Sequence, residues 1–228
     1  MSWRMGECVT ADPLCRWPKV CSMDCIYCRH GTSSISAPSR TVFVNTDDFK
    51  EELANVPPKE KTKMLWFFGN GEPALAMNIK EMIQTARMAG FKRIAVLTNS
   101  TLLNDPSVRE DLKLSDILIA KLDASQERTF QRVNRPFPGI DFKNVLEGLH
   151  RMRREYRGSF RIHVTLIDEN QKEVDHIADL CKELQPETVY LSTPRLSNLV
   201  SPLPRKVMAG AGSGFRKKGM NVLLENPT

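Results

Sequence analysis

Three cysteines near the N-terminus lie close enough in sequence to ligate one metal centre. Cys21, Cys25 and Cys28 lie in the segment CSMDCIYC, in the pattern C-x3-C-x2-C. Thiolates on one short loop can ligate three corners of a cubane iron–sulfur cluster, which leaves the fourth iron open to another ligand. Electron-carrying ferredoxins supply four thiolates to each cluster. A set of three therefore favours chemistry at the open iron over simple electron transfer.

A structural zinc site is the alternative interpretation of these cysteines. Such sites use four protein ligands, commonly two pairs separated by an intervening segment. Cys15 or His30 would have to supply the fourth ligand here, so the residue types alone leave zinc open. Disulfides are not expected, because five of the 6 cysteines lie in the first 28 residues and no charged-then-apolar leader precedes them. We accordingly expect a reducing compartment and a cytoplasmic location.

Polar segments that follow apolar runs are the next candidates for chemistry. The segment GNGEP at 69–73 and the pair NS at 99–100 each follow such a run. Glycine lets a backbone approach a ligand closely, because it has no Cβ, and amide or hydroxyl side chains can hydrogen-bond sugar hydroxyls. The structural alternatives are a tight turn for the glycines and capping of a strand end for Asn99 and Ser100.

A scaffold of alternating strands and helices must position these segments. Apolar runs typical of buried parallel strands lie at 64–68, 93–97, 117–120, 160–166 and 189–192, with a short extended run at 41–44. Helical patterns between them begin near Asn45, Asp105 and Asp141, and others are predicted near 125–133 and 171–184.

This alternation predicts an α/β fold with a parallel sheet and right-handed crossovers. With a further strand just before Cys21, there are about six β/α units, whereas a full eight-unit barrel needs about 250 residues. We therefore predict a partial TIM-like (β/α)6 barrel over residues 1–194, with an open doubly wound sheet as the alternative. Prolines and glycines after Pro194 predict a loop-rich C-terminal tail over 195–228.

Strand parity predicts which side chains line the lumen of such a barrel. Arg161, His163 and Thr165 alternate with apolar residues, and Lys121 and Asp123 share the parity of Ile117 and Ile119. Charges cannot cheaply lie beneath apolar helices. We therefore predict that Lys121, Asp123 and His163 face the lumen at the C-terminal end of the strands, where barrel enzymes place their chemistry. A buried Lys121–Asp123 ion pair and a hydrogen-bonded core histidine are the structural alternatives.

The cysteine motif, with the aromatic Tyr27 before its last cysteine, resembles the signature of the radical S-adenosylmethionine (SAM) superfamily. The segments GNGEP at 69–73, TNS at 98–100, KLDA at 121–124, NRP at 134–136 and STP at 192–194 follow in order. Together they are similar to a subgroup related to the tRNA wyosine synthase, over residues 12–194. That subgroup carries three further N-terminal cysteines, whereas only Cys8 and Cys15 precede the motif here, so a second cluster is not expected.

The resemblance implies a 4Fe-4S cluster on Cys21, Cys25 and Cys28, with SAM bound at its open iron and cleaved reductively. The resulting 5′-deoxyadenosyl radical would take a hydrogen atom from a substrate held by Lys121, Asp123 and His163. The SAM-binding residues would be Tyr27 beside the adenine, Gly69, Asn70, Gly71, Glu72 and Pro73 at the methionyl ammonium, Asn99 and Ser100 at the ribose, Arg135 at the carboxylate, and Thr193.

The sequence is compatible with several classes of substrate. A small molecule, a tRNA guanosine and the protein partner of an activase are the enzymatic alternatives, each with an electron donor of the flavodoxin or ferredoxin type. A non-enzymatic metal-binding module is the remaining one. The net charge of +6 is compatible with a phosphate-bearing partner or with a solvated basic surface. No apolar run approaches the roughly 20 residues of a membrane-spanning helix, so no membrane is expected.

Overall fold

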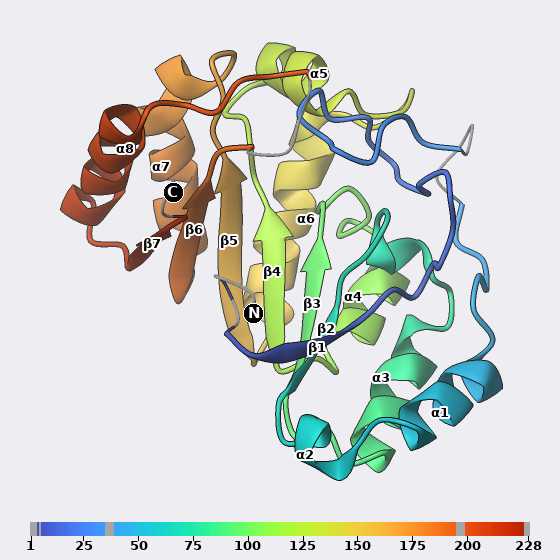
Figure 1. The fold of residues 1–228 in the computed structure, drawn as a ribbon. Helices are drawn as coiled ribbons and strands as arrows, with labels where there is room; N and C mark the ends of the chain where they lie inside the picture. The colour runs from blue at the N-terminus through green and yellow to red at the C-terminus, as the bar shows by residue number, and fades with distance from the viewer. Residues whose placement is uncertain (1–3, 5, 35–38, 195–198, 226–228) are drawn as a thin grey trace.

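A parallel sheet of seven strands forms the frame of the molecule, in the spatial order β1-β2-β3-β4-β5-β6-β7 (Figure 1). The computed structural model describes residue 4 and residues 6–34, 39–194 and 199–225. The strands are β1 Cys8–Ala11, β2 Met64–Phe67, β3 Ile94–Thr98, β4 Ile117–Lys121, β5 Ser159–Thr165, β6 Thr188–Ser192 and β7 Val222–Leu224. Every neighbouring pair is parallel. Consecutive order with helical crossovers is the topology of an incomplete barrel, as predicted.

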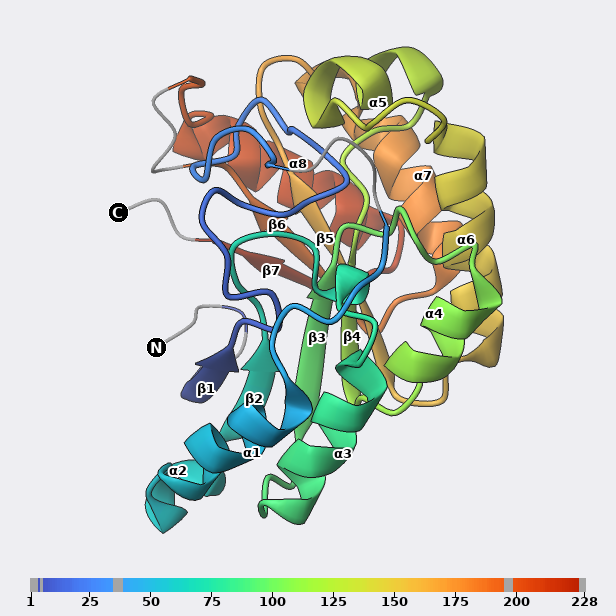
Figure 2. The same ribbon diagram turned by 90° about the vertical axis from the view of Figure 1, so that its right-hand side faces the viewer.

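Helices cover one face of the sheet, the outer face of the partial barrel (Figure 2). They are α1 Thr46–Ala54, α2 Pro58–Lys61, α3 Ile79–Met88, α4 Pro106–Leu112, α5 Glu127–Asn134, α6 Phe142–Glu155, α7 Val174–Leu184 and α8 Arg205–Lys217, with 3-10 turns η1 Pro73–Leu75 and η2 Gln171–Glu173. The predicted caps are present, since the side chains of Asn45, Asp105 and Asp141 each accept a backbone N–H of the following turn. In the part of the chain that is described, no helix combines the length and the apolar character that crossing a membrane requires.

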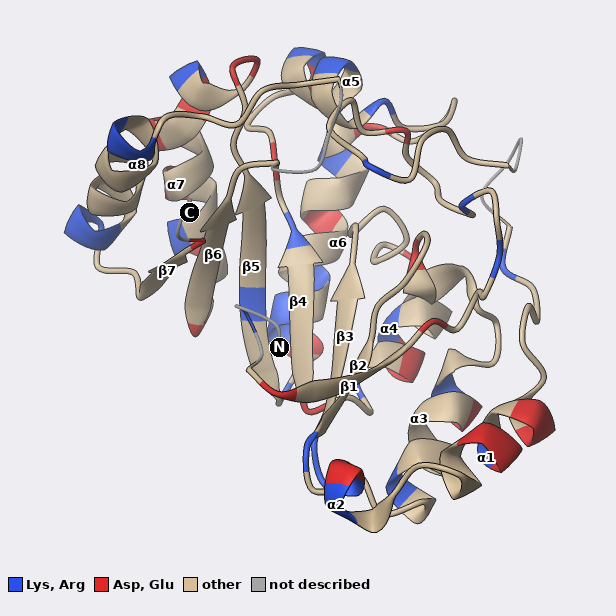
Figure 3. Ribbon diagram, in the orientation of Figure 1, with Lys and Arg blue, Asp and Glu red and all other residues tan. Residues whose placement is uncertain are grey.

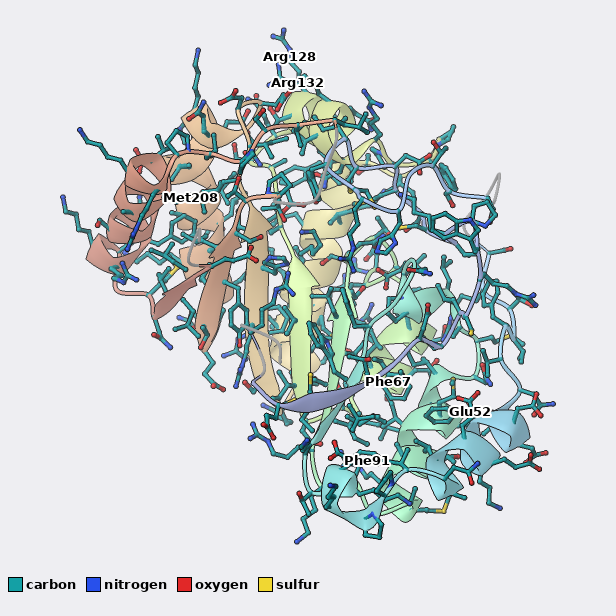
Figure 4. The ribbon with its side chains drawn as sticks, in the orientation of Figure 1. Glu52, Phe67, Phe91, Arg128, Arg132 and Met208 are labelled. Atoms are coloured by element: carbon teal, nitrogen blue, oxygen red, sulfur yellow. The ribbon has the colours of Figure 1, made fainter. Side chains whose placement is uncertain are left out.

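Strand parity separates two apolar clusters. Leu118, Ile162 and Leu191 point outward into the large core beneath the helices. A smaller apolar cluster lies on the inner face of the sheet and consists of Met64, Trp66, Ala95, Ile117, Ile119 and Tyr190. Phe67, Phe91 and Met208 of α8, which are labelled in Figure 4, all belong to the outer core. The alternation predicted for strands β4 and β5 is therefore observed.

The first strand lies earlier in the chain than expected. The predicted strand just before Cys21 is reduced to one bridge between Val20 and Gly71, and the predicted strand at 41–44 to one bridge between Thr41 and Ala76. The first strand of the sheet is instead β1, Cys8–Ala11, which pairs with β2. Thr41 instead lies beside η1, since its N–H donates to Leu75 O at 3.1 Å and its carbonyl oxygen accepts Met77 N–H at 2.9 Å.

The prediction of a loop-rich tail over 195–228 is wrong for residues 205–224. α8 packs against α7, and β7 extends the sheet beside β6. Met208, Ala211 and Phe215 form an apolar helical stripe that is buried. Glycine in this segment lowers helix propensity but permits close packing, since a Cβ on Gly212 would lie 3.0 Å from Leu224 Cδ2. Burial of the stripe outweighs the propensity of the glycines.

Candidate active site

The cysteine loop lies at the carboxyl edge of the sheet, where the N-terminal segment crosses above the strand ends (Figures 1 and 2). Backbone hydrogen bonds hold it there. Asp24 N–H donates to Arg135 O at 2.9 Å, and Ile26 N–H donates to Val133 O at 2.9 Å. On the opposite side, Val20 N–H donates to Asn70 O at 3.2 Å. The loop thus spans from the turn after β2 to the end of α5.

Two side-chain amides are directed at the thiols of this loop. Asn99 Nδ2 lies 3.5 Å from Cys21 Sγ, and Asn134 Nδ2 lies 3.5 Å from Cys25 Sγ. All six cysteines are free of disulfides. Burial raises the pKa of the Cys21 thiol to about 12 and also raises the pKa of Cys25. Ligation of a metal centre would deprotonate these thiols, and donors directed at sulfur stabilise the resulting charge.

A structural zinc ion would require four ligands gathered at one point. Zn–S bonds are about 2.3 Å long, so thiolates on one ion lie within about 4.6 Å of each other. Among the described residues, no group of three or more His, Cys, Asp and Glu side chains is gathered to hold one metal ion. In a cubane each cysteine ligates a different iron, which spreads the thiolates apart. Of the two candidate fourth ligands, Cys15 is exposed, and His30 Nε2 accepts a hydrogen bond from Arg29 Nε at 3.2 Å.

Packing within the protein explains the glycines at 69 and 71. A Cβ on Gly69 would lie 2.0 Å from the Asp12 Cγ, and a Cβ on Gly71 would lie 1.8 Å from the Val20 carbonyl oxygen. Gly71 also has a φ of +152°. Protein atoms therefore fill the Cβ positions of both glycines, and the contact of this turn with the ammonium of SAM stays a prediction. Asp12, which the sequence analysis missed, fixes the turn by accepting Asn70 N–H at 2.8 Å.

The carboxylate of Glu72 is turned into the protein. It accepts hydrogen bonds from the Thr98 hydroxyl at 2.7 Å, from Ala74 N–H at 3.0 Å and from Asn99 N–H. Burial raises the pKa of Glu72 to about 7, against the lowering effect of these donors. Glu72 thus joins η1, which begins at the buried Pro73, to the end of β3. Its contact with SAM stays a prediction.

Asn99 and Ser100 are both engaged by the protein. Asn99 Nδ2 donates to Ser22 Oγ at 2.9 Å, and its Oδ1 accepts from Thr101 N–H at 3.0 Å. Ser100 is buried with a φ of 75°, and its hydroxyl donates to Lys121 O at 2.9 Å. Asn99 therefore faces the cysteine loop, whereas Ser100 joins the ends of β3 and β4. Their contacts with ribose stay a prediction.

Asp123 is the centre of a polar group on the inner face. Its Oδ2 accepts from the Tyr27 hydroxyl and from Asn134 Nδ2 at 2.9 Å. Its Oδ1 accepts from Thr165 N–H at 2.7 Å and pairs with Lys121 Nζ at 3.3 Å. Burial raises the pKa of Tyr27, and the neighbouring Asp123 raises it further. The phenol therefore stays neutral and donates its proton to Asp123.

Lys121 and His163 lie on the inner face but have separate partners. Lys121 Nζ donates to Thr165 Oγ1 at 2.8 Å and lies 5.3 Å from the centre of the Tyr27 ring, a cation–π contact. His163 Nε2 and Ser192 Oγ are 2.8 Å apart. Burial, with the charges of Arg4 and Lys121, holds the pKa of His163 well below its usual value, so the imidazole is neutral.

The last two residues predicted to bind SAM lie at the rim. Arg135 is exposed and ends α5 in the left-handed conformation, with a φ of 44°. Thr193 is buried, and its hydroxyl accepts Leu203 N–H at 2.8 Å. Thr193 thus holds the segment that leads into α8, and any contact with SAM stays a prediction.

Two further buried polar residues lie outside the motifs found in the sequence. Asn170 Nδ2 donates to Asp123 O and Thr165 O, both at 2.8 Å, which ties the ends of β4 and β5 together. Lys19 is 2% exposed, and its Nζ contacts Met23 O at 3.1 Å. Burial lowers the pKa of Lys19, but Cys28, Cys21 and Cys25 and the hydrogen bond with Asp24 together raise this pKa by more. The only sequence signal for Lys19 was its position two residues before the first cysteine of the motif.

Similarity to known sequences identifies the family of this chain. The sequence model of the radical SAM superfamily matches residues 17–181. A UPF0026 protein of Synechocystis is 34% identical over 194 residues, which cover 85% of this chain and 72% of that protein. A UPF0026 protein of Methanocaldococcus jannaschii is 31% identical over 182 residues, covering 77% of this chain and 56% of that protein. A Brachyspira hyodysenteriae protein named GTPase Obg is 30% identical over 204 residues, but these cover 30% of that longer protein.

Solved structures share the fold. Streptococcus suis SuiB bound to S-adenosylmethionine matches with a TM-score of 0.72 and 14% identity, over 97% of this chain and 51% of that one. AnSMEcpe with bound AdoMet gives 0.68 and 16%, over 96% and 63%. A domain of pyruvate-formate lyase-activating enzyme from Bacteroides vulgatus gives 0.59 and 18%, over 71% and 98%. The chain therefore belongs to the radical SAM superfamily of enzymes, among the UPF0026 proteins.

Proposed function

We propose that this enzyme ligates a 4Fe-4S cluster through Cys21, Cys25 and Cys28 and cleaves SAM reductively to start radical chemistry on a substrate. The observation that carries the proposal is that one loop brings three free thiols to the carboxyl edge of a partial barrel, with amides directed at two of them. When bound, the cluster supplies the electron that breaks a carbon–sulfur bond of SAM. The protein supplies binding, orientation and exclusion of water.

SAM would be bound by residues that surround the loop. The backbone of Gly69, Asn70, Gly71, Glu72 and Pro73 offers polar groups beside Val20, next to the first ligand Cys21. Glu72 fixes the backbone of Asn99, which positions the Asn99 amide near that ligand. Tyr27 would contact the adenine, and Ser100, Arg135 and Thr193 complete the set proposed from the family resemblance.

The substrate would be held by the polar inner face below the loop. Lys121 would anchor an anionic group, because its ammonium is directed toward Tyr27 of the cysteine loop while Asp123 keeps its position. The neutral His163 would offer a hydrogen bond further down the lumen, where its imidazole meets Ser192. The structural alternative for Lys121 and Asp123 is a buried ion pair without contact to substrate, which turnover measurements distinguish.

Anaerobic reconstitution tests the proposal. The full chain should bind about four irons with acid-labile sulfide, and dithionite should drive release of 5′-deoxyadenosine from SAM. Replacing all three motif cysteines with alanine should abolish both results. The matched control is Cys15→Ala, which removes an exposed cysteine of the same N-terminal segment and should keep the cluster. Zinc without sulfide in the purified wild-type chain would overturn the proposal.

Modification of tRNA guanosine of the wyosine type is the second candidate function. The observation that favours it is the inner-face position of Lys121, which lies in the KLDA segment similar to that subgroup. Unmodified tRNA should then accelerate 5′-deoxyadenosine release by the reconstituted enzyme, with a reduced flavodoxin or ferredoxin as electron donor. A candidate protein partner forms the parallel arm, since acceleration by protein alone would identify an activase and exclude tRNA.

A further inference from the structure

We propose that Lys19 is a fixed positive charge beneath the cysteine loop, which raises the reduction potential of the cluster that the loop ligates. The inference rests on the proposed function, because it requires that cluster. Neither the superfamily motif nor the catalytic group on the inner face uses Lys19. Its assignment comes from the burial of its ammonium and from the residues that surround it.

The loop is wrapped around the Lys19 ammonium. Nζ lies 3.1 Å from the Met23 carbonyl oxygen and 3.2 Å from Asp24 Oδ1, and both partners lie between the first two cysteines of the motif. The Lys19 side chain is 2% exposed. On the other side of the loop, Ser34 N–H donates to Lys19 O at 2.8 Å. The chain therefore closes around a charge that solvent does not reach.

Asp24 neutralises this charge incompletely. Its carboxylate is 23% exposed and is shared, since Asp24 Oδ1 also accepts Ser33 N–H at 2.7 Å. Met23 O and Asp24 Oδ1 hold the Lys19 ammonium against the stretch of chain between Cys21 and Cys25. A buried ammonium without full compensation is unfavourable. Negative charge on the ligated thiolates would supply the compensation, so the loop is arranged for an anionic group above Lys19.

The physical consequence is a preference for the reduced cluster. Reduction transfers one electron from an external low-potential donor to the cluster, with no bond formed or broken in the protein, and makes the site more negative. A positive charge in a poorly solvated environment stabilises that added charge, and net charge and burial are among the factors that set cluster potentials. Lys19 should therefore raise the potential, and the Asp24 carboxylate should lower it.

Redox titration of the reconstituted full chain, followed by electron paramagnetic resonance, tests this inference. Lys19→Met keeps the length of the side chain and removes its charge. At a fixed potential near the wild-type midpoint, we expect the ratio of reduced to oxidised cluster to fall about tenfold, which is about 59 mV for one electron. Lys19→Arg keeps the charge and should stay near wild type. Lys113→Met, at the exposed Glu110 pair on α4, is the matched control without an effect.

Asp24→Asn provides a test with the opposite sign. The amide oxygen can still accept Ser33 N–H, so the loop is retained while the negative charge beside Lys19 is removed. The reduced fraction should rise in this variant. If Lys19→Met loses iron, the Asp24→Asn shift decides the inference by itself. An unchanged midpoint in Lys19→Met at full iron content, or no rise in Asp24→Asn, would overturn it. A wild-type chain that binds no cluster would instead overturn the proposed function.

Discussion

At the scale of single residues, the polar side chains of the site hydrogen-bond one another. Asp123 holds Tyr27, Asn134 and Lys121 at once. Glu72 holds Asn99 against the cysteine loop. Removing the donor of a buried acceptor lowers the free energy of unfolding. The effect of a substitution on stability must therefore be measured separately from its effect on the reaction.

Lys121→Met separates these two effects. The variant keeps the length of the side chain but loses the contacts with Thr165 and Asp123, so we expect it to be destabilised by about 1–2 kcal/mol. Iron content and slow uncoupled cleavage of SAM should stay near wild type, whereas acceleration by the native substrate should be lost. Release of 5′-deoxyadenosine with and without substrate measures this. The exposed Lys92→Met is the control, and full acceleration in Lys121→Met would assign Lys121 a structural role only.

Glu72 makes stability depend on pH. Its pKa is raised from 4.5 to about 7 in the folded chain, so between these values the folded state keeps a proton that the unfolded chain releases. Stability from this group is therefore present below about pH 4.5 and is lost as the pH rises to about 7, a decrease of about 3 kcal/mol. Urea unfolding across this range should show the decrease in wild type and not in Glu72→Gln. Parallel curves for the two chains would contradict the assignment.

At the scale of elements, the turn after β2 and the cysteine loop form one packed unit. The Val20 carbonyl oxygen occupies the position where a Cβ of residue 71 would lie, and the same oxygen accepts Glu72 N–H at 3.0 Å. The turn therefore positions the loop directly. Displacing either one should move the thiols without a change in any cysteine.

Gly71→Ala tests this packing. Overlap with Val20 and the unfavourable backbone conformation should together cost about 2–5 kcal/mol, and iron loading should decrease with it. Gly90→Ala is the matched control, because Gly90 also has a positive φ but no atoms lie within 4 Å of its Cβ position. That variant should lose only about 1–2 kcal/mol and load iron fully. Thermal unfolding and iron content measure both, and equal losses in the two variants would show that packing against Val20 is unimportant.

At the scale of the whole molecule, the C-terminal segment completes the sheet. α8 and β7 extend the barrel beyond β6, and Glu225 N–H donates to Leu191 O at 2.9 Å. Charged residues gather on the helices and loops, whereas few lie on the strands (Figure 3), and Arg128 and Arg132 project from α5 (Figure 4). Residues 205–225 therefore pack against the sheet that carries the site.

Phe215→Ala measures how strongly the C-terminal segment is coupled to the rest. Phe215 is fully buried, so its truncation should cost about 3–5 kcal/mol. Val207→Ala, on the exposed side of the same helix, should change stability by less than about 0.5 kcal/mol. If the segment is an independent tail, neither substitution will shift the unfolding midpoint of the sheet, as monitored by the fluorescence of the inner-face Trp66.

Local patterns determined much of this protein without the structure. The spacing of Cys21, Cys25 and Cys28 is a property of one loop, and the alternation in β4 and β5 assigns each side chain to a face because successive residues of a strand point to opposite sides. The alternation is sufficient for the inner-face position of Lys121. The prediction of the partial barrel rests on about six β/α units in a chain shorter than a full barrel needs, with an open doubly wound sheet as the alternative.

Only the tertiary structure decided what fills the space between segments that are distant in the chain. In the folded chain, Lys19 is buried under the motif, the Glu72 carboxylate accepts a hydrogen bond from Thr98 at the end of β3, and Val20 packs against Gly71. In addition, β1 pairs with the edge of β2, and the glycine-containing C-terminal segment forms α8. The physical reason is the same in each case: burial and hydrogen bonding depend on partners many residues away, which neither spacing nor local propensity specifies.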